Sequence, residues 1–196
     1  LKYVKMIKYV YILMFMGIVP FATYAQQSKE DDIVVEVAWK DSHFSSNKTL
    51  MENIKEMEAI SQILTVFDKG ELEALSVSEE NLTIFVPLDT ALETMSRKER
   101  KMFLESTPKS ELKAMWQEYI VPGRLDEYAI IRNIENQGGK SIFVRTLGKN
   151  QLEFFLKNKE VHLRDVYGNE TKWVKGDFYH KHGFFHFIDS LLFYKK

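Results

Sequence analysis

The sequence of 196 residues contains no cysteine. This absence excludes disulfide bonds and a cysteine nucleophile. It also excludes an export signal of the bacterial lipoprotein type, because that signal needs a cysteine to acylate. A chain of this length buries a sizeable core without covalent bridges. The fold that we expect therefore does not depend on disulfide bonds.

An excess of one charge sign is also absent. Lys and Arg number 27 and Asp and Glu 28, which gives a formal net charge of −1. Three of the lysines lie within the first eight residues, and without them the charge falls to about −4. Charges of both signs are interspersed, as on an ordinary solvated surface. We expect no nucleic-acid partner, because such a partner requires a basic patch.

Motifs of common enzymes are missing as well. The chain has no G-x-S-x-G elbow, no G-x-G-x-x-G phosphate loop and no H-E-x-x-H pair. The paired acids Asp31-Asp32 and Glu79-Glu80 lie in polar runs, where solvated surface is the ordinary interpretation. We predict that the protein is not an enzyme and uses no cofactor.

The first 25 residues have the pattern of a secretory signal peptide. A start with three lysines precedes an apolar run from Tyr9 to Phe21 and small residues before Gln26. The run is shorter than the roughly 20 residues that a membrane-spanning helix needs. An uncleaved anchor is the alternative, but Pro20 favours cleavage because it ends the helical run just before the site.

A signal peptide of this kind directs export, and its cleavage is expected to leave no membrane span. The expected location is the periplasm, the extracellular space or the cell surface. Secreted eukaryotic domains more often carry disulfide bridges than this chain does, which favours a bacterial source. Residues 26–46 are predicted to form an N-terminal leader with a possible extra strand at Ile33–Trp39, and residues 47–196 one domain.

The order of elements in that domain indicates an α+β fold. Apolar residues recur at helical spacing from Leu50 to Phe67, with a break expected near Ala59. A buried strand at Leu82–Val86 and further helices follow. After Gly138 the pattern changes to short strands and turns. Helices in the first half and antiparallel strands in the second half are typical of α+β proteins.

Three stretches carry a resemblance to a known family. "LTIFVPLDTAL" (82–92) is similar to the first conserved box of fasciclin domains, and "HGFFHFIDSLLF" (182–193) to the second. "YIVPGRL" (119–125) stands where the family has a strand that ends in V-V-x-G. The resemblance implies a fasciclin-like fold, an antiparallel β-sandwich or wedge flanked by several helices. It covers about residues 47–194.

Several positions depart from the family pattern. Leu88 replaces the usual Thr, Leu92 the usual Phe, and His182-Gly183 the common Asn-Gly. Glu118-Tyr119 stands where many members have a Tyr-His pair. In some animal members that pair is implicated in adhesion. Integrin-type motifs therefore should not be carried over to this chain.

The resemblance assigns structural roles to the motif residues. Asp89, or its neighbour Thr90, is expected to cap the helix that follows, and Gly183 to permit a tight turn. His186 is expected to be buried and bonded to a backbone group, and Asp189 to accept backbone N–H groups at a turn. The full set of structural motif residues is Phe85, Pro87, Asp89, Gly123, Gly183, His186, Ile188 and Asp189.

Three histidines near the end of the chain raise the question of a metal site. His180 and His182 project to the same side if the chain there is extended, which is the geometry of many metal-binding pairs. A third ligand is needed, and His186 is expected to point into the fold instead. A solvated loop is the alternative. We predict no metal site, with His180 and His182 as weak candidates.

An aromatic-rich segment precedes the last strand. Trp173, Phe178 and Tyr179 form an exposed binding platform if their rings face solvent, because exposed aromatic patches mark protein or sugar contacts. If the rings pack back onto the sheet, the segment belongs to the core. The sequence leaves both alternatives open.

The function implied by the resemblance is a non-catalytic extracellular or periplasmic interaction module, used in cell adhesion or surface assembly. The alternative is a carbohydrate-binding or small-ligand-binding protein of the bacterial envelope. The expected partner is a protein or glycan at the cell surface.

Overall fold

The computed structural model describes residues 33–77 and 81–194. The predicted signal peptide and residues 26–32 of the predicted leader lie outside the described residues. Between Glu36 and Asn136 the elements in chain order are β1 (Glu36–Trp39), β2 (Ser42–Ser45), α1 (Leu50–Ile54), η1 (Glu58–Ile60), α2 (Ser61–Lys69), α3 (Leu72–Ser76), β3 (Leu82–Pro87), η2 (Asp89–Leu92), α4 (Arg97–Lys101), η3 (Met102–Ser106), α5 (Lys109–Gln117), β4 (Ile120–Pro122) and α6 (Glu127–Asn136). After them come β5 (Ile142–Arg145), β6 (Gln151–Lys157), β7 (Glu160–Arg164), β8 (Glu170–His180) and β9 (Gly183–Ile188).

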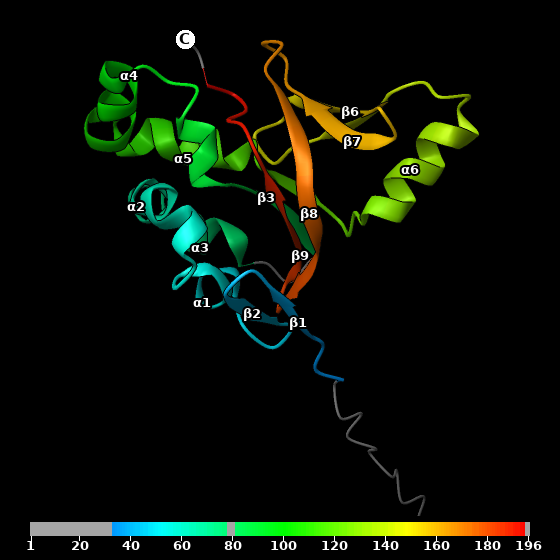
Figure 1. Cartoon of the computed structure of the whole chain (residues 1–196), viewed down its shortest axis with the longest axis horizontal. Helices are drawn as coiled ribbons and strands as arrows, with labels where there is room; N and C mark the ends of the chain where they lie inside the picture. Colours follow the sequence, from blue (N-terminus) through cyan, green and yellow to red (C-terminus); the bar gives the residue numbers. More distant parts are fainter. Residues whose placement is uncertain (1–32, 78–80, 195–196) are drawn as a thin grey trace, which may run out of the picture. The chain divides into compact units, whose positions relative to one another are not determined.

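Seven of the strands form one sheet in the order β4-β3-β9-β8-β7-β6-β5 (Figure 1). The α+β prediction is confirmed, and the hairpins from β5 to β9 are antiparallel as expected. The exception is the central pair β3 and β9, which run parallel. These strands lie about a hundred residues apart and contain the two conserved boxes. The sheet is therefore mixed, because a long connection permits a parallel pairing that a hairpin does not.

The two ends of the sheet approach each other. The Leu147 N–H donates to the Ile120 carbonyl over 2.8 Å, and the Gly148 N–H donates to the Gln117 carbonyl over 3.1 Å. These bonds join the β5–β6 turn to the end of α5 and the start of β4. The sheet is consequently a nearly closed wedge.

β3 and β9 form the middle of the core, and every residue of both strands is buried. Gly183 begins β9 at a φ of +141°, and a Cβ at this position would overlap the backbone of Leu82. The parallel pairing thus requires a glycine where the two chains come closest.

Residues 36–45 form a hairpin that packs against the sheet. The Trp39 ring stacks on Phe187 with centroids 4.7 Å apart, and Phe44 meets Phe185 edge to face at 5.2 Å. Aromatic pairs of this kind add about 0.5–1.5 kcal/mol beyond their buried area. The hairpin is therefore part of the core.

The helical stripe between residues 50 and 67 is buried as its periodicity predicts, and the break falls at η1. α2 packs against α5, and α6 lies against β5, β6 and β7 (Figure 1). In the described residues no helix is long and apolar enough to cross a membrane.

Candidate functional site

A cleft of about 330 Å³ opens between α5 and the segment that follows β9. Its walls come from parts of the chain that are far apart in sequence, namely η3, α5, the β5–β6 turn, the β7–β8 turn and the C-terminal segment. The lining residues are Phe103, Thr107, Glu111, Ala114, Met115, Glu118, Asn150, Tyr167, Phe193 and Tyr194.

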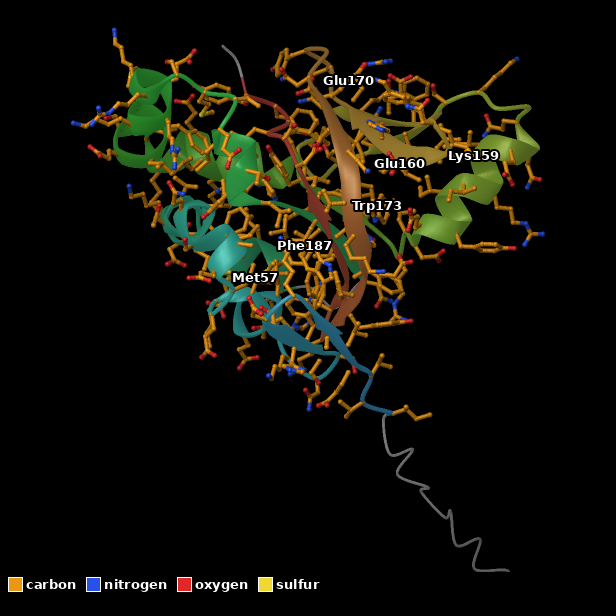
Figure 2. All side chains as sticks on the ribbon, viewed as in Figure 1. Met57, Lys159, Glu160, Glu170, Trp173 and Phe187 are labelled. Atoms are coloured by element: carbon orange, nitrogen blue, oxygen red, sulfur yellow. The ribbon has the colours of Figure 1, made fainter. Side chains whose placement is uncertain are left out.

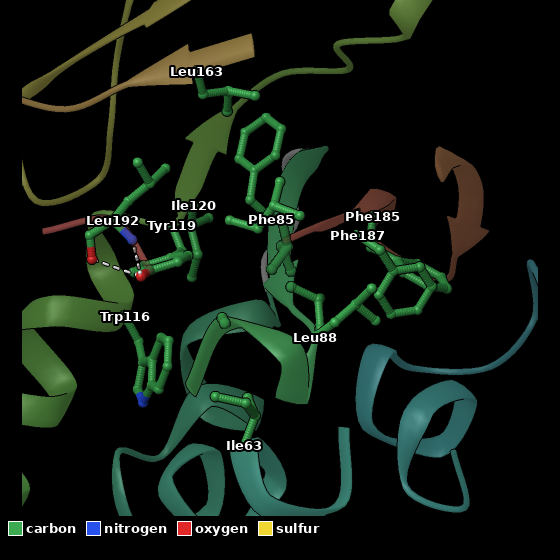
Figure 3. Packing of buried hydrophobic residues seen from close by; sticks show 14 of the residues in the cluster. Ile63, Phe85, Leu88, Trp116, Tyr119, Ile120, Leu163, Phe185, Phe187 and Leu192 are labelled. Atoms are coloured by element: carbon green, nitrogen blue, oxygen red, sulfur yellow. Dashed lines mark hydrogen bonds between the residues drawn. The ribbon is translucent and has the colours of Figure 1, made fainter. Parts of the chain in front are cut away.

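The C-terminal wall is held by Tyr119. Its buried hydroxyl donates to the Leu192 carbonyl over 2.6 Å and accepts from the Leu192 N–H over 2.7 Å (Figure 3). Burial raises the pKa of this hydroxyl far above its usual value, so it stays protonated. One side chain thus satisfies both backbone groups of a residue that belongs to no strand.

The buried carboxylate of Asp165 holds the other side of the rim. It accepts the N–H groups of Tyr167 over 2.8 Å and of Asn169 over 2.9 Å, and it also accepts the N–H of Phe193. The Asn169 amide in turn donates to the Tyr194 carbonyl over 3.1 Å. The backbone that carries three aromatic rings of the cleft is therefore fixed by one acidic side chain.

The lining of the cleft includes a buried carboxylate. Glu118 is only 8% exposed and accepts hydrogen bonds from the Thr146 hydroxyl and, over 2.8 Å, from the Asn150 amide. A Cβ on Gly148 would overlap this carboxylate, so the turn leaves room for it only because residue 148 is glycine. No Lys, Arg or His among the described residues forms an ion pair with Glu118.

The described lining carries charge of one sign. Glu111 and Glu118 contribute carboxylates, and none of the lining residues that the structure describes is Lys, Arg or His. Partial burial raises the pKa of the Tyr194 hydroxyl, and the nearby carboxylates of Glu99 and Glu111 raise it further. The cleft is therefore an aromatic pocket with negative potential.

The structure decides between the two alternatives for the aromatic segment, and it excludes an exposed position for Trp173 and Phe178. Trp173, which is labelled on β8 in Figure 2, is 3% exposed, and Phe178 is fully buried. The Trp173 ring lies 4.0 Å from the ring of His186, and Phe178 packs on Phe44 at 4.7 Å. Tyr179 is half-buried against Phe184. The hairpin β1–β2 and the inner face of the sheet cover these rings, which the sequence of the segment alone does not reveal.

The two candidate metal ligands lie at the β8–β9 turn. His180 is buried, and its Nδ1 accepts the His182 N–H over 3.3 Å. Burial, and then the charge of His182, lower the pKa of His180 to about 4. No group of three or more potential ligands converges anywhere in the described part of the chain.

His186 lies elsewhere, inside the sheet. Its Nδ1 accepts the Asp177 N–H over 2.9 Å, so Nε2 carries the proton and donates to the Leu125 carbonyl over 2.8 Å. Burial lowers its pKa to about 3, against the opposing effect of the Leu125 bond. The Asp177 carboxylate stands 3.8 Å away, but no ion pair exists at neutral pH because the imidazole is uncharged.

The expected role of Asp89 requires a correction. Its carboxylate accepts the N–H groups of Gln62 and Ile63 and the hydroxyl of Ser61, so it caps α2 and not the following turn. The residue before α2 is Ile60, which has no side-chain acceptor. The Asp89 carboxylate, 27 residues from Gln62 in the sequence, therefore acts as the N-terminal cap of α2.

The remaining motif residues join strands. Phe85, Pro87 and Ile188 are buried in the central pair. The Gly123 N–H donates to the Asn81 carbonyl over 2.7 Å, next to β3. The Asp189 carboxylate accepts the Lys172 N–H and the hydroxyls of Thr171 and Ser190, which ties the end of β9 to the start of β8.

Sequence reasoning missed the cleft. Asn150, Tyr167 and Tyr194 belong to turns and a terminal segment and follow no common spacing. The available signal for the cleft was Glu118. This acidic residue comes just before a strand and departs from the residue that is usual in the family at that position.

Comparisons with known proteins identify the fold. A family model described as "Fasciclin domain" matches residues 43–194. One similar solved structure is that of a FAS1 domain pair from the insect cell adhesion molecule fasciclin I, with 13% sequence identity and a TM-score of 0.63. The match covers 83% of this chain and 59% of that one, so the chain spans less than two thirds of the domain pair. The search of curated proteins found no match.

Proposed function

Because the chain belongs to the fasciclin domain family, whose members are generally non-catalytic, adhesion-related and extracellular or secreted, we propose that it binds a protein at the cell surface. In this role it serves cell adhesion or surface assembly. The N-terminal signal pattern supports export to the periplasm or the cell surface, and the absence of cysteine supports a bacterial source.

The single observation that carries the proposal is the family match over residues 43–194, which includes nearly all of the described residues. The similar insect structure supports the fold alone, because its identity to this chain is only 13%. No catalytic step is proposed.

The cleft between α5 and the C-terminal segment is the contact site that the geometry favours. Its rim is built from turns held by Tyr119 and Asp165, so a partner meets a surface that is already ordered. Pre-ordered surfaces lose less conformational entropy on binding than mobile ones do. Half of the Tyr167 surface is exposed at this rim.

One observation also favours the alternative, a carbohydrate-binding or small-ligand-binding protein of the envelope. The cleft combines aromatic rings with the carboxylate of Glu111 and the amide of Asn150. Sugars stack on such rings and donate hydroxyl hydrogens to such acceptors. Exposure of Tyr167 is therefore compatible with either partner class.

An array of matrix proteins and glycans, probed with the purified protein with and without EDTA, separates the two. Protein binding that survives EDTA and weakens in Tyr167→Ala supports the interaction module. Glycan-only binding that is lost in Tyr167→Ala replaces it with the alternative. Val166→Ala is the matched control, because Val166 is equally exposed in the same turn but does not line the cleft.

A further inference from the structure

The Glu118 carboxylate is unusual because it is buried and forms no ion pair with any Lys, Arg or His in the described part of the chain. Burial of a charged group is costly unless hydrogen bonds and an opposite charge compensate for the lost water. The Thr146 and Asn150 side chains supply one neutral hydrogen bond to each oxygen. A carboxylate has about four acceptor positions, so acceptor capacity remains for a further donor.

The remaining capacity belongs to a residue that lines the cleft. A positively charged donor in the cleft would form a stronger hydrogen bond to Glu118 than a neutral donor, because charge-assisted hydrogen bonds are roughly twice as strong. Glu111, which is exposed on α5, adds a second carboxylate on the same side.

The walls of the cleft suit the same ligand. Phe103 and Tyr194 meet edge to face with ring centroids 5.5 Å apart, and Tyr167 belongs to the same lining. Ring faces attract ammonium and guanidinium groups by about 0.5–2 kcal/mol. The apolar surfaces of Met115 and Phe193 can pack against an alkyl stem.

The negative charge of the cleft lining does not extend to α4, where basic residues line another hollow. Arg97, Arg100 and Lys101 of α4 line a separate hollow together with one carboxylate, that of Glu105. We therefore expect an anionic group to bind at this hollow in preference to the cleft. The two regions predict opposite ligand charges on one domain, which makes the assignment testable.

We propose that the cleft binds the side chain of a lysine or arginine that projects from the protein partner. The ammonium or guanidinium group bonds to Glu118, and the stem packs against the aromatic lining. A cleft of about 330 Å³ is at the small end of ligand sites, which matches a single anchoring side chain. This inference rests on the proposed function, since it requires a protein partner.

The test is a ¹H–¹⁵N correlation titration of the purified protein with four small probes. Nα-acetyl-arginine amide and Nα-acetyl-lysine amide carry the charge, and Nα-acetyl-citrulline amide and Nα-acetyl-norleucine amide are the neutral counterparts. We expect saturable shifts in the amide signals of Glu118, Asn150, Tyr167 and Tyr194 with the charged probes only. Equal shifts with neutral probes, shifts centred on α4, or no saturable shifts would overturn the proposal.

Substitution of single carboxylates tests which of them binds the charged probe. Glu118→Gln should weaken binding of the arginine probe on the order of tenfold or more, because it removes the buried charge. Glu93→Gln changes an exposed carboxylate outside the cleft and should leave affinity unchanged. If Glu118→Gln fails to fold, Glu111→Gln on the exposed rim takes its place and should weaken binding several-fold. Unchanged affinity in the folded variant counts against the proposal.

The probe titration and the binding array test different proposals, and their failures can be told apart. Protein binding in the array together with no response to the charged probes overturns the lysine or arginine anchor and leaves the interaction module standing. Glycan-only binding in the array overturns the interaction module itself.

Discussion

Acidification should destabilise this protein at a pH where most carboxylates are still ionised. His186 and His180 are both buried, with pKa values lowered to about 3 and about 4. In the unfolded chain their pKa returns to about 6.5. Below pH 6.5 the unfolded state therefore binds more protons than the folded state, and the free energy of unfolding falls as the pH falls.

The size of the effect follows from these values. Each pH unit between the unfolded and folded pKa is worth about 1.4 kcal/mol per group. Between pH 7 and pH 5 each histidine therefore contributes a loss of ~2 kcal/mol, or ~4 kcal/mol together. Burial raises the pKa of Asp177 and of Glu127, and their protonation in the folded state offsets part of the loss at lower pH. The comparison is therefore made at pH 5 and above.

Urea unfolding followed by circular dichroism at pH 7 and pH 5 measures the difference. With a slope of about 2 kcal/mol per molar urea, the midpoint should fall by about 2 M. His180→Gln should remove about half of the pH dependence. Equal midpoints at the two pH values would refute the reasoning, because they would mean that neither imidazole is held neutral by burial.

Four substitutions test the structural account by thermal and urea unfolding. His186→Ala should cost about 1–3 kcal/mol, because the Asp177 N–H and the Leu125 carbonyl lose their buried partner; an unchanged melting curve would show that the imidazole is free. Asp89→Ala should cost about 1–2 kcal/mol through the lost cap of α2, whereas Thr90→Ala should be nearly neutral. Tyr119→Phe should cost about 1–3 kcal/mol, because both backbone groups of Leu192 lose their partner; a smaller loss than for Tyr128→Phe on the exposed face of α6 would contradict this. Gly183→Ala should cost about 2–4 kcal/mol through overlap with Leu82, and a stability equal to wild type would mean that β3 and β9 do not pair as described.

Local patterns predicted most of the elements. The apolar period from Leu50 to Phe67 predicted the helices and their break, and the first box predicted a strand at Leu82–Val86, which the structure has as β3 at Leu82–Pro87. The second box lies in the region predicted to form short strands, and its strand is β9 at Gly183–Ile188. The parallel pairing of those strands did not follow from any local pattern. It depends on a contact across about a hundred residues that no spacing in the chain encodes.

Side-chain environments were harder to predict for the same reason. Trp173 and Phe178 are as aromatic as an exposed platform requires, and only the position of β1–β2 and the inner sheet face decides that they are covered. Asp89 precedes a helical turn and looks like its cap, but the unsatisfied N–H groups of α2 lie closer to its carboxylate. In both cases tertiary contacts decide between alternatives that the local sequence leaves equal.

The cleft was unpredictable because its residues come from five separate segments. Glu118 reads as an ordinary surface acid at the end of a helix, and its burial depends on a turn that contains Gly148. Asp165, which orders the rim, reads as an ordinary turn residue. The structure brings these roles together through the near closure of the sheet.

We propose above all that this domain binds a protein partner through the cleft that Tyr194 lines. The most direct measurement is the solution affinity of wild type, Glu118→Gln and Glu93→Gln for the first protein that the array identifies. We predict that Glu118→Gln weakens binding on the order of tenfold or more while Glu93→Gln binds like wild type. Equal affinity of all three proteins would contradict the account and place the contact elsewhere on the domain.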